Sequence, residues 1–524
     1  MVSCIKEEFH EDIFDVSLNL TPGLAIPIGY SHLEIEKYLQ DSALSELHIS
    51  EDGFLTLFYS SDVFNENMGN FLSFSPVSLN TSLLNTTGMT IDLQGAGITF
   101  NINDSLLIPV SLDQTGVRID SLHLLGGILQ VDMTQTGLNG TVTFTFPGVQ
   151  MYGVPYIITR NISDPDFTLD LAGYSIIPER DINGDHFLRC MLFIGLQSPS
   201  GPVGSGSALF SVQTNISSVS FESLYGDFSG LAIDIDPFRL SPQIFNEFID
   251  GHCYFADPEI KLIINNSCGI PAGISFSRFE VTDQDNIIIP VTGSGVPAVS
   301  DPRIIRYPSL SEEGLSVSDS LVLNKSNSNI TDVLAVNPVE VNITAQAAIV
   351  SPANSESTFI RYDSEVDITA SLKLPLYGKA EFLVLLDTIT FDYLSTTLPV
   401  PEEIEQLIVQ LNITNSFPVT LTPQVYLLDE NRILLDSLFT GTEKIEGAKD
   451  TNGDGKADPH IQDPVYIDLP REKIDALSET HYLITKGELT TTDYPDSDVR
   501  FYSTYYLDYI IGLIAQLKIN TGGR

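Results

Sequence analysis

The sequence predicts a mainly β protein, built from antiparallel β-sandwich-like domains in series with a few short helices. Apolar and polar residues alternate with a period of two over many segments, of which 141–146 and 366–374 are clear examples. Such alternation is typical of antiparallel strands with one buried and one exposed face. Helical periodicity is confined to four short segments: 32–44, 242–250, 401–407 and 471–477.

The length of the chain and the breaks in its sequence pattern predict three domains. A chain of 524 residues is too long for one hydrophobic core. A stretch rich in Gly, Pro, Ser and Asn begins at Gly293, and a softer break lies near 164–173. We therefore expect, in order, a tether over 1–27, β domain 1 over 28–170, β domain 2 over 171–300, a linker over 301–329 and β domain 3 over 330–524.

Two segments, 263–286 and 411–431, resemble each other. Each contains an apolar strand, an Asn-Ser turn with a proline nearby, a long strand and an acidic turn. This pattern indicates two related β modules, and a chance likeness between hairpins is the alternative.

The charge of the chain restricts its partners. Its 69 Asp and Glu residues face 25 Lys and Arg, which gives a net charge of −44. Such a field repels phosphate backbones and anionic headgroups, so we expect no nucleic-acid partner. The same field attracts divalent cations, although a saline or extracellular habitat accounts for the composition equally well.

The first residues contain a cysteine in a distinctive context. Cys4 is followed by Ile5, Lys6, Glu7 and Glu8. This Cys-x-Lys-Glu-Glu start resembles the export signal of surface lipoproteins in Bacteroidetes. The resemblance implies lipidation of Cys4, secretion by the general pathway and attachment to the outer membrane at the cell surface. The lipobox itself is absent, and an ordinary cysteine behind a native Met1 is the alternative.

The likeness extends weakly along the chain. The Asn-Ser strand pairs, and a tail with Val499-Arg500-Phe501-Tyr502 before Leu507-Asp508, are similar to uncharacterised exported lipoproteins of the same group. That group implies a location and no catalytic motif. With Cys4 lipidated, Cys253 and Cys268 either form a disulfide or remain buried thiols.

One segment has the spacing of a metal site. Residues 450–458 place side-chain oxygens at positions 1, 3, 5 and 9, and glycine at position 6, of an EF-hand-type loop. Position 7 contributes a backbone carbonyl, and Ile461 at position 12 lacks the required carboxylate. The predicted ligands of a structural calcium ion are Asp450, Asn452, Asp454, Lys456, Asp458 and Asp463. A tight turn is the alternative, since Asn-Gly and Asp-Gly favour turns.

Signatures of catalysis are missing from the sequence. It contains no Gly-x-Ser-x-Gly elbow, phosphate loop or dinucleotide fingerprint, and no two of its eight histidines are three or four residues apart. We expect a non-enzymatic cell-surface lipoprotein for adhesion, binding or assembly with an outer-membrane partner, and a protein or a glycan as the kind of molecule it contacts. A carrier of lipid or other apolar ligands is the alternative. A carbohydrate-active enzyme comes third, because glycosidases need only two carboxylates.

Overall fold

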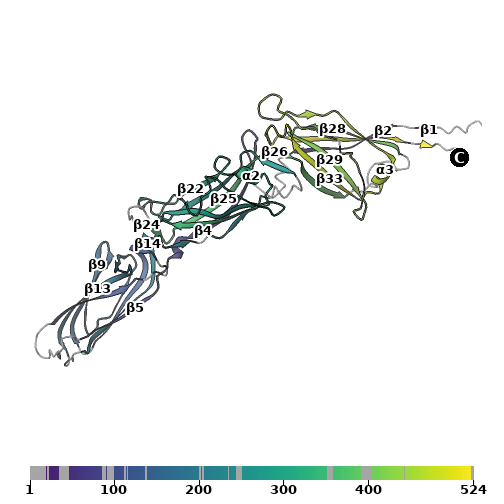
Figure 1. Ribbon diagram of the computed structural model, residues 1–524. Helices are drawn as coiled ribbons and strands as arrows, with labels where there is room; N and C mark the ends of the chain where they lie inside the picture. The colour runs from purple at the N-terminus through teal and green to yellow at the C-terminus, as the bar shows by residue number, and fades with distance from the viewer. Residues whose placement is uncertain are drawn as a thin grey trace, which may run out of the picture.

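Three β-sandwiches lie in a row along an elongated molecule (Figure 1). We name them the tip, middle and base domains. The structure is a computed structural model that describes residues 19–20, 23–34, 46–84, 90, 100–110, 112, 114, 116–135, 138–199, 202, 206–233, 235–242, 251–350, 358–390, 404–441, 443–517 and 519–520. Its sheets are antiparallel throughout the named strands, so the predicted mainly β class is confirmed.

The tip domain contains the middle part of the chain. Its principal strands are β5 (Val77–Leu84), β6 (Phe100–Pro109), β7 (Arg118–Gln135), β8 (Leu138–Met151), β9 (Val154–Asn161), β10 (Phe167–Asp170), β13 (His186–Pro199) and β14 (Ala208–Asp227). They pair in the orders β5-β14-β7-β10 and β6-β13-β8-β9. Two short strands extend the sheets: β11 (Ser175–Ile176), which pairs with β7 and β8, and β12 (Glu179–Arg180), which pairs with β13.

The middle domain joins strands from both sides of the tip in the sequence. They are β4 (Leu55–Asn67), β16 (Phe238–Leu240), β18 (Glu259–Asn266), β19 (Ala272–Thr282), β20 (Ile288–Pro290), β22 (Val317–Leu323), β23 (Glu340–Ile349) and β25 (Glu365–Pro375). They pair in the orders β4-β25-β18-β22 and β16-β23-β19-β20. Short strands add to their edges: β3 (Glu46–Ile49), β15 (Ala232–Ile233) and β21 (Arg303–Ile304).

The base domain joins the two ends of the chain. Its strands are β2 (Gly23–Glu34), β27 (Leu383–Thr390), β28 (Ile404–Asn415), β29 (Val419–Leu428), β30 (Leu434–Ser437), β32 (Val465–Leu469), β33 (Tyr482–Thr491) and β35 (Tyr506–Leu517). They pair in the orders β2-β35-β28-β32 and β27-β33-β29-β30. β31 (His460–Ile461) also pairs with β28. Beyond them, β1 (Asn19–Leu20) pairs with β36 (Ile519–Asn520) at the end of the molecule opposite the tip (Figure 1).

All three domains have one topology. Taking the principal strands of each domain in chain order, one sheet reads first-eighth-third-sixth and the other second-seventh-fourth-fifth. This strand order is that of the jelly roll, a sandwich of two Greek keys. The chain therefore contains three jelly rolls.

The jelly rolls are nested. After its first strand, β2, the base domain is interrupted by the whole of the middle and tip domains, and it resumes at β27. After its first strand, β4, the middle domain is interrupted by the tip domain and resumes at β15 and β16. Each insertion lies at the same topological position, between the first and second strands.

The structure groups the chain differently from the predicted series of domains. The boundary expected between 28–170 and 171–300 falls inside the tip domain, since β10 and β11 both pair with β7. The segment 301–329, expected as a linker, contains β21, the 3-10 helix η4 (Leu310–Glu312) and β22. In β22, Leu321 and Leu323 are buried in the middle core. Alternation identifies strands but not their partners, so nesting was not visible in the sequence.

The helical predictions have mixed outcomes. The segment 471–477 is helical, as α3 (Arg471–Ser478), whereas 404–407 lies in β28. Ile404 and Leu407 are both buried although three residues apart, because a β-bulge between Ile404 and Gln406 shifts the strand. A short helix that was not expected, α2 (Ile330–Leu334), precedes β23. Residues 32–34, also predicted to be helical, lie in β2, and the segments 35–44, 243–250 and 401–403 lie outside the described residues.

The predicted internal repeat is confirmed in atomic detail. Asn266 and Asn415 each accept, through Oδ1, a hydrogen bond from the backbone N–H two residues later, at 2.8 and 2.9 Å. Ser267 and Ser416 each accept one, through Oγ, from the first residue of the neighbouring strand, at 2.7 and 2.6 Å. The two asparagines end β18 and β28, and the two serines follow directly. β18 and β28 are the third strands of the middle and base jelly rolls.

Candidate functional site

The predicted calcium loop, residues 450–458, is an exposed turn of the base domain held by its own hydrogen bonds. The Asp450 carboxylate accepts from the backbone N–H groups of Gly453 and Gly455, at 2.6 and 2.8 Å. Asn452 accepts through Oδ1 from Asp454 N–H at 2.9 Å. Both glycines have positive φ, of 79° and 86°, which an L side chain rarely adopts. The loop is thus bent as the spacing predicted.

The remaining predicted ligands are less well placed. The Asp458 carboxylate accepts hydrogen bonds from Thr451 and Asn452, and the bond from the Thr451 hydroxyl is the main cause that lowers the pKa of Asp458. Asp463 is exposed between β31 and β32. Among the described residues, no three His, Cys, Asp or Glu side chains are grouped to hold a metal ion. Calcium binding by Asp450, Asn452, Asp454 and the backbone carbonyl of Lys456 therefore stays a prediction.

The loop lies against the joint between the base and middle domains. The Lys456 ammonium donates a 2.7 Å hydrogen bond to the backbone carbonyl of Asp52, in the turn before β4, and lies 4.5 Å from the ring centroid of Tyr502. The backbone N–H of Ala457 donates to the hydroxyl of Tyr505 at 2.7 Å. Burial raises the pKa of Tyr505 to about 12, so its hydroxyl stays protonated.

Backbone pairing fastens the same joint. Leu55 N–H donates to Phe501 O at 3.1 Å, and Ser503 N–H donates to Gly53 O at 2.8 Å. Next to them is a three-stranded sheet of β17 (His252–Phe255), β26 (Tyr377–Glu381) and β34 (Val499–Arg500). Because strands from both domains share these hydrogen bonds, the joint is a continuous β structure rather than a linker.

A cleft opens beside the joint. Its volume is about 600 Å³, and residues of both domains line it, among them Asp52, Lys373, Tyr377, Arg500 and Tyr502. A second hollow of about 370 Å³ adjoins it and shares Lys325 and Tyr377. The side chains that line the cleft come from five separate segments of the chain. Only one of them was singled out from the sequence, the tail segment Val499-Arg500-Phe501-Tyr502.

The carboxylate of Glu313 connects the middle and tip domains at their joint. Glu313 accepts hydrogen bonds from Ser223 Oγ at 2.6 Å and from the Tyr225 hydroxyl at 2.8 Å. Burial, and then this bond, raises the pKa of Tyr225 to about 12. Arg361 lies 3.7 Å from Glu313, and its strand β24 (Thr358–Arg361) pairs with β14 of the tip. The sheet of the tip therefore continues into the middle domain.

The tip domain presents an outer sheet face whose central described residues are uncharged, with the Arg189–Glu179 ion pair at its border. Inward-facing residues such as Phe144 are fully buried, whereas Ile157, Phe193 and Met191 on the outer face are 60%, 50% and 43% exposed. On the same face, the hydroxyl groups of Thr143 and Thr159 form a hydrogen bond of 2.8 Å. Cross-strand neighbours on this face, which we call the neutral face, are Asn101, Asn103, Ser105, Thr141, Thr143, Thr145, Ile157, Thr159, Asn161, Met191, Phe193 and Gly195.

The cysteines have separate outcomes. Cys190, Cys253 and Cys268 are free thiols, so Cys253 and Cys268 do not form a disulfide. Burial raises the pKa of each of the three to about 12, which makes them unreactive. Cys4, the predicted lipidation site, lies outside the described residues.

The interior of the middle sandwich is filled by side chains. The apolar cavity between its sheets, lined by residues such as Phe64, Ile264 and Ile368, has a volume of about 40 Å³. That space is close to the size of one water molecule and far below that of an acyl chain. Within the described residues, no helix is both long enough and apolar enough to cross a membrane.

Comparisons with known proteins assign no family. No family model matches the chain, and no curated protein matches it. Among solved structures, it is similar to a protein of Parabacteroides distasonis thought to be secreted, with 9% identity, a TM-score of 0.29, and coverage of 94% of this chain and 99% of the other.

Viral proteins give lower scores. A structure of infectious bursal disease virus has 8% identity and a TM-score of 0.15, covering 88% of this chain and 86% of that chain. A structure that describes the triple jelly roll fold and turret assembly in an archaeal virus has 9% identity and a TM-score of 0.12, covering 88% of this chain and 91% of that chain. At such scores the likenesses support no conclusion, and the jelly-roll assignment rests on strand pairing alone.

Proposed function

We propose that this chain is a non-enzymatic surface protein, a rod held at its base and projecting the tip domain for adhesion, binding or assembly. One observation carries the proposal. Both ends of the described chain pair in β1 and β36 beside the base domain, while the tip lies at the opposite end of the row (Figure 1). A protein attached through either terminus thus places its central residues farthest from the attachment point.

The structure of the two joints favours a rod with little bending between its domains. Nested insertion makes the chain pass each joint twice, and backbone pairing between β14 and β24 and between Leu55 and Phe501 adds to the covalent connections. Contacts of this kind restrict hinge motion more than a single flexible linker does. The stiffness supports a role in display rather than in closure around a substrate.

The neutral face supports contact at the tip. In a chain of net charge −44, most surfaces repel an acidic partner. The neutral face brings no carboxylate to a contact and exposes Ile157, Met191 and Phe193 among hydroxyl and amide side chains. Grouped apolar side chains with a polar surround are typical of protein interaction sites.

The anchor in this proposal is Cys4. Support comes from its sequence context, Cys-x-Lys-Glu-Glu, and from its place in the sequence before β1, which lies beside the base domain. Lipidation there, after export by the general secretory pathway, attaches the base to the outer membrane and leaves the rod outside the cell. Calcium bound by Asp450, Asn452, Asp454 and Lys456 stiffens the loop that supports the lower joint.

Membrane fractionation with Cys4→Ala tests the anchor. Cells that make the full protein with its native export signal are metabolically labelled with an alkyne fatty acid, fractionated, and treated with external protease. The proposal predicts labelled, protease-sensitive protein in the outer membrane, and unlabelled protein in the medium for Cys4→Ala. Cys253→Ala, at a cysteine of the middle domain, is the matched control and stays membrane-bound. Retention of the Cys4→Ala protein in the membrane contradicts the anchor.

A further inference from the structure

The cleft at the joint of base and middle domains has the position and size of a small-molecule site. Domain interfaces are preferred places for ligand sites, and volumes of about 300–1,000 Å³ are typical of them. The cleft measures about 600 Å³ and adjoins a second hollow of about 370 Å³. It is lined by polar and aromatic side chains rather than by the apolar residues of a core.

Two carboxylates in the cleft already have partners within the protein. Asp257 lies 2.5 Å from the ammonium of Lys325. The Asp52 carboxylate accepts hydrogen bonds from Ser50 Oγ at 2.5 Å and from Phe54 N–H at 3.2 Å, which lower its pKa. These groups therefore shape the cleft without demanding a ligand.

Two cations and one carboxylate remain uncommitted. The Arg500 guanidinium lies 4.6 Å from the ring centroid of Tyr377 and forms no ion pair or hydrogen bond with any described residue. Lys373 is likewise without an ion pair among the described residues, and it stands directly across the strand pair from Glu259. A guanidinium stacked on an aromatic ring keeps its row of N–H donors free and fixed in orientation, which suits a bidentate carboxylate.

We propose that this cleft binds the carboxylate-bearing sugar unit of an acidic oligosaccharide. Arg500 holds the sugar carboxylate through two parallel N–H donors, with the Lys373 ammonium as the second cation. The sugar hydroxyls donate to Glu259 and accept from the Asn324 side-chain amide, whose N–H₂ group has no partner among the described residues. The proposal concerns the chain alone and does not rest on how the rod is anchored.

The free donors of Arg500 select a ligand that carries a carboxylate. The cleft as a whole has no net charge, since Asp52, Asp257 and Glu259 balance Lys325, Lys373 and Arg500. The surrounding field of −44 opposes long phosphate polymers, whose charge far exceeds that of a short oligosaccharide. A neutral sugar, in turn, leaves the donors of Arg500 without a charged acceptor, and these bonds are about twice as strong when the acceptor is ionised.

Isothermal titration calorimetry with trigalacturonate tests the proposal on the full chain. The matched probe is the fully methyl-esterified trimer, which keeps size and hydroxyls and removes the charges. We expect the acidic trimer to bind and the ester to bind at least tenfold more weakly. Arg500→Gln removes charge-assisted hydrogen bonds and is expected to weaken binding roughly 10- to 100-fold.

Two variants and one further probe make the result decisive. Arg432→Gln is the matched control, because Arg432 also stacks on a tyrosine, Tyr482, at 5.1 Å in the base domain, and binding should be unchanged. Arg500→Lys keeps the charge without the paired donors and should give an intermediate affinity, even if Arg500→Gln fails to fold. No binding of the trimer, equal binding of its ester, equal binding of triglutamate, or equal losses in Arg500→Gln and Arg432→Gln would each overturn the proposal.

Discussion

The ammonium group of Lys456 donates a hydrogen bond of 2.7 Å to the backbone carbonyl oxygen of Asp52, 404 positions earlier in the chain. Lys456 belongs to the base domain and Asp52 to the middle domain. The same ammonium lies 4.5 Å from the ring centroid of Tyr502, whose side chain is only 4% exposed. One lysine of the 450–458 loop thus connects two of the three jelly rolls.

Replacing Lys456 by Met is expected to loosen this joint. The change removes a charge-assisted hydrogen bond and a cation–π contact, together worth about 1–2 kcal/mol at a partly exposed site. Hydrogen exchange at the amides of Leu55 and Ser503, which pair across the joint, should accelerate roughly 5- to 30-fold. Lys473→Met is the control, since that ammonium bonds to Leu438 O within the base domain. Unchanged exchange in Lys456→Met would show that the contact adds no stability.

Calcium is expected to bind the 450–458 loop weakly, with a dissociation constant of about 10⁻⁴–10⁻³ M, as in extracellular modules. Asp454→Ala removes a predicted ligand whose carboxylate accepts, among the described residues, only from Lys456 N–H, so the fold should survive and calcium binding should be lost. Titration followed by native mass spectrometry measures this. Asp181→Ala is the control, because Asp181 also caps an acidic turn through backbone hydrogen bonds. Equal calcium binding by the wild-type protein and by Asp454→Ala would contradict a calcium site in this loop.

The tip domain offers two phenylalanines on adjacent strands with opposite environments. Phe144 of β8 is fully buried, and Phe193 of β13 is 50% exposed on the neutral face. Phe144→Ala should destabilise the tip by about 3–5 kcal/mol, whereas Phe193→Ala should cost less than about 0.5 kcal/mol. Hydrogen exchange along β7 and β14, read against denaturant, reports the local stability. A similar loss in both variants would contradict the assignment of these two faces.

The strand pair β2–β35 should weaken as the pH rises. His32 Nδ1 lies 2.5 Å from Asp508 Oδ1, and this bond, followed by that to Glu34, raises the pKa of His32 above its ordinary value of 6.5. Its stabilising contribution is therefore complete below pH 6.5 and is lost as the pH passes the raised folded value. Amide exchange along β2 at constant intrinsic rate should show this trend, and His32→Gln should abolish it.

A second histidine gives the opposite trend and serves as an internal comparison. His186 Nε2 accepts a 2.9 Å hydrogen bond from Ile119 N–H, which requires the neutral ring, and burial lowers the pKa of His186. Its contribution is present above pH 6.5 and is lost as the pH falls through the lowered folded value. NMR titration that places the pKa of His32 below that of His186 would contradict both assignments.

The class of fold was accessible from the sequence because local patterning determines it. The alternation over 141–146 places Val142, Phe144 and Phe146 in the tip core, each fully buried. The Asn-Ser repeat likewise marks equivalent strand ends in two jelly rolls, since the same hydrogen bonds recur at Asn266 and Asn415. These features depend only on neighbours in the chain.

The arrangement of domains was not accessible, because it depends on contacts remote in sequence. β4 pairs with β25 although the whole tip domain separates them, and no local signal names that partner. The helical spacing of Ile404 and Leu407 was misleading because a bulge reproduces it in a strand. The cleft was missed for the same reason as the nesting: Lys373 and Arg500 are brought together only by the fold.

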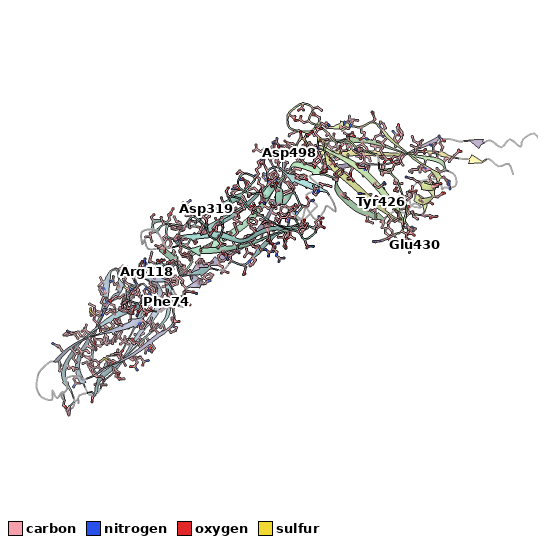
Figure 2. The ribbon with its side chains drawn as sticks, in the orientation of Figure 1. Phe74, Arg118, Asp319, Tyr426, Glu430 and Asp498 are labelled. Carbon is pink, nitrogen blue, oxygen red and sulfur yellow. The ribbon has the colours of Figure 1, made fainter. Side chains whose placement is uncertain are left out.

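The height of the tip above the membrane tests the rod most directly. Genetically encoded fluorophores are placed at Asn139, at the far end of the tip strands, and at Glu430, in the outer turn of the base (Figure 2). Strands of 12 residues, such as β35, span roughly 40 Å, so three domains in a row separate the labels by about 100 Å. Interferometric height measurement on outer-membrane vesicles should place Asn139 about 100 Å above Glu430. Equal heights, or Glu430 above Asn139, would contradict the account of a base-anchored rod.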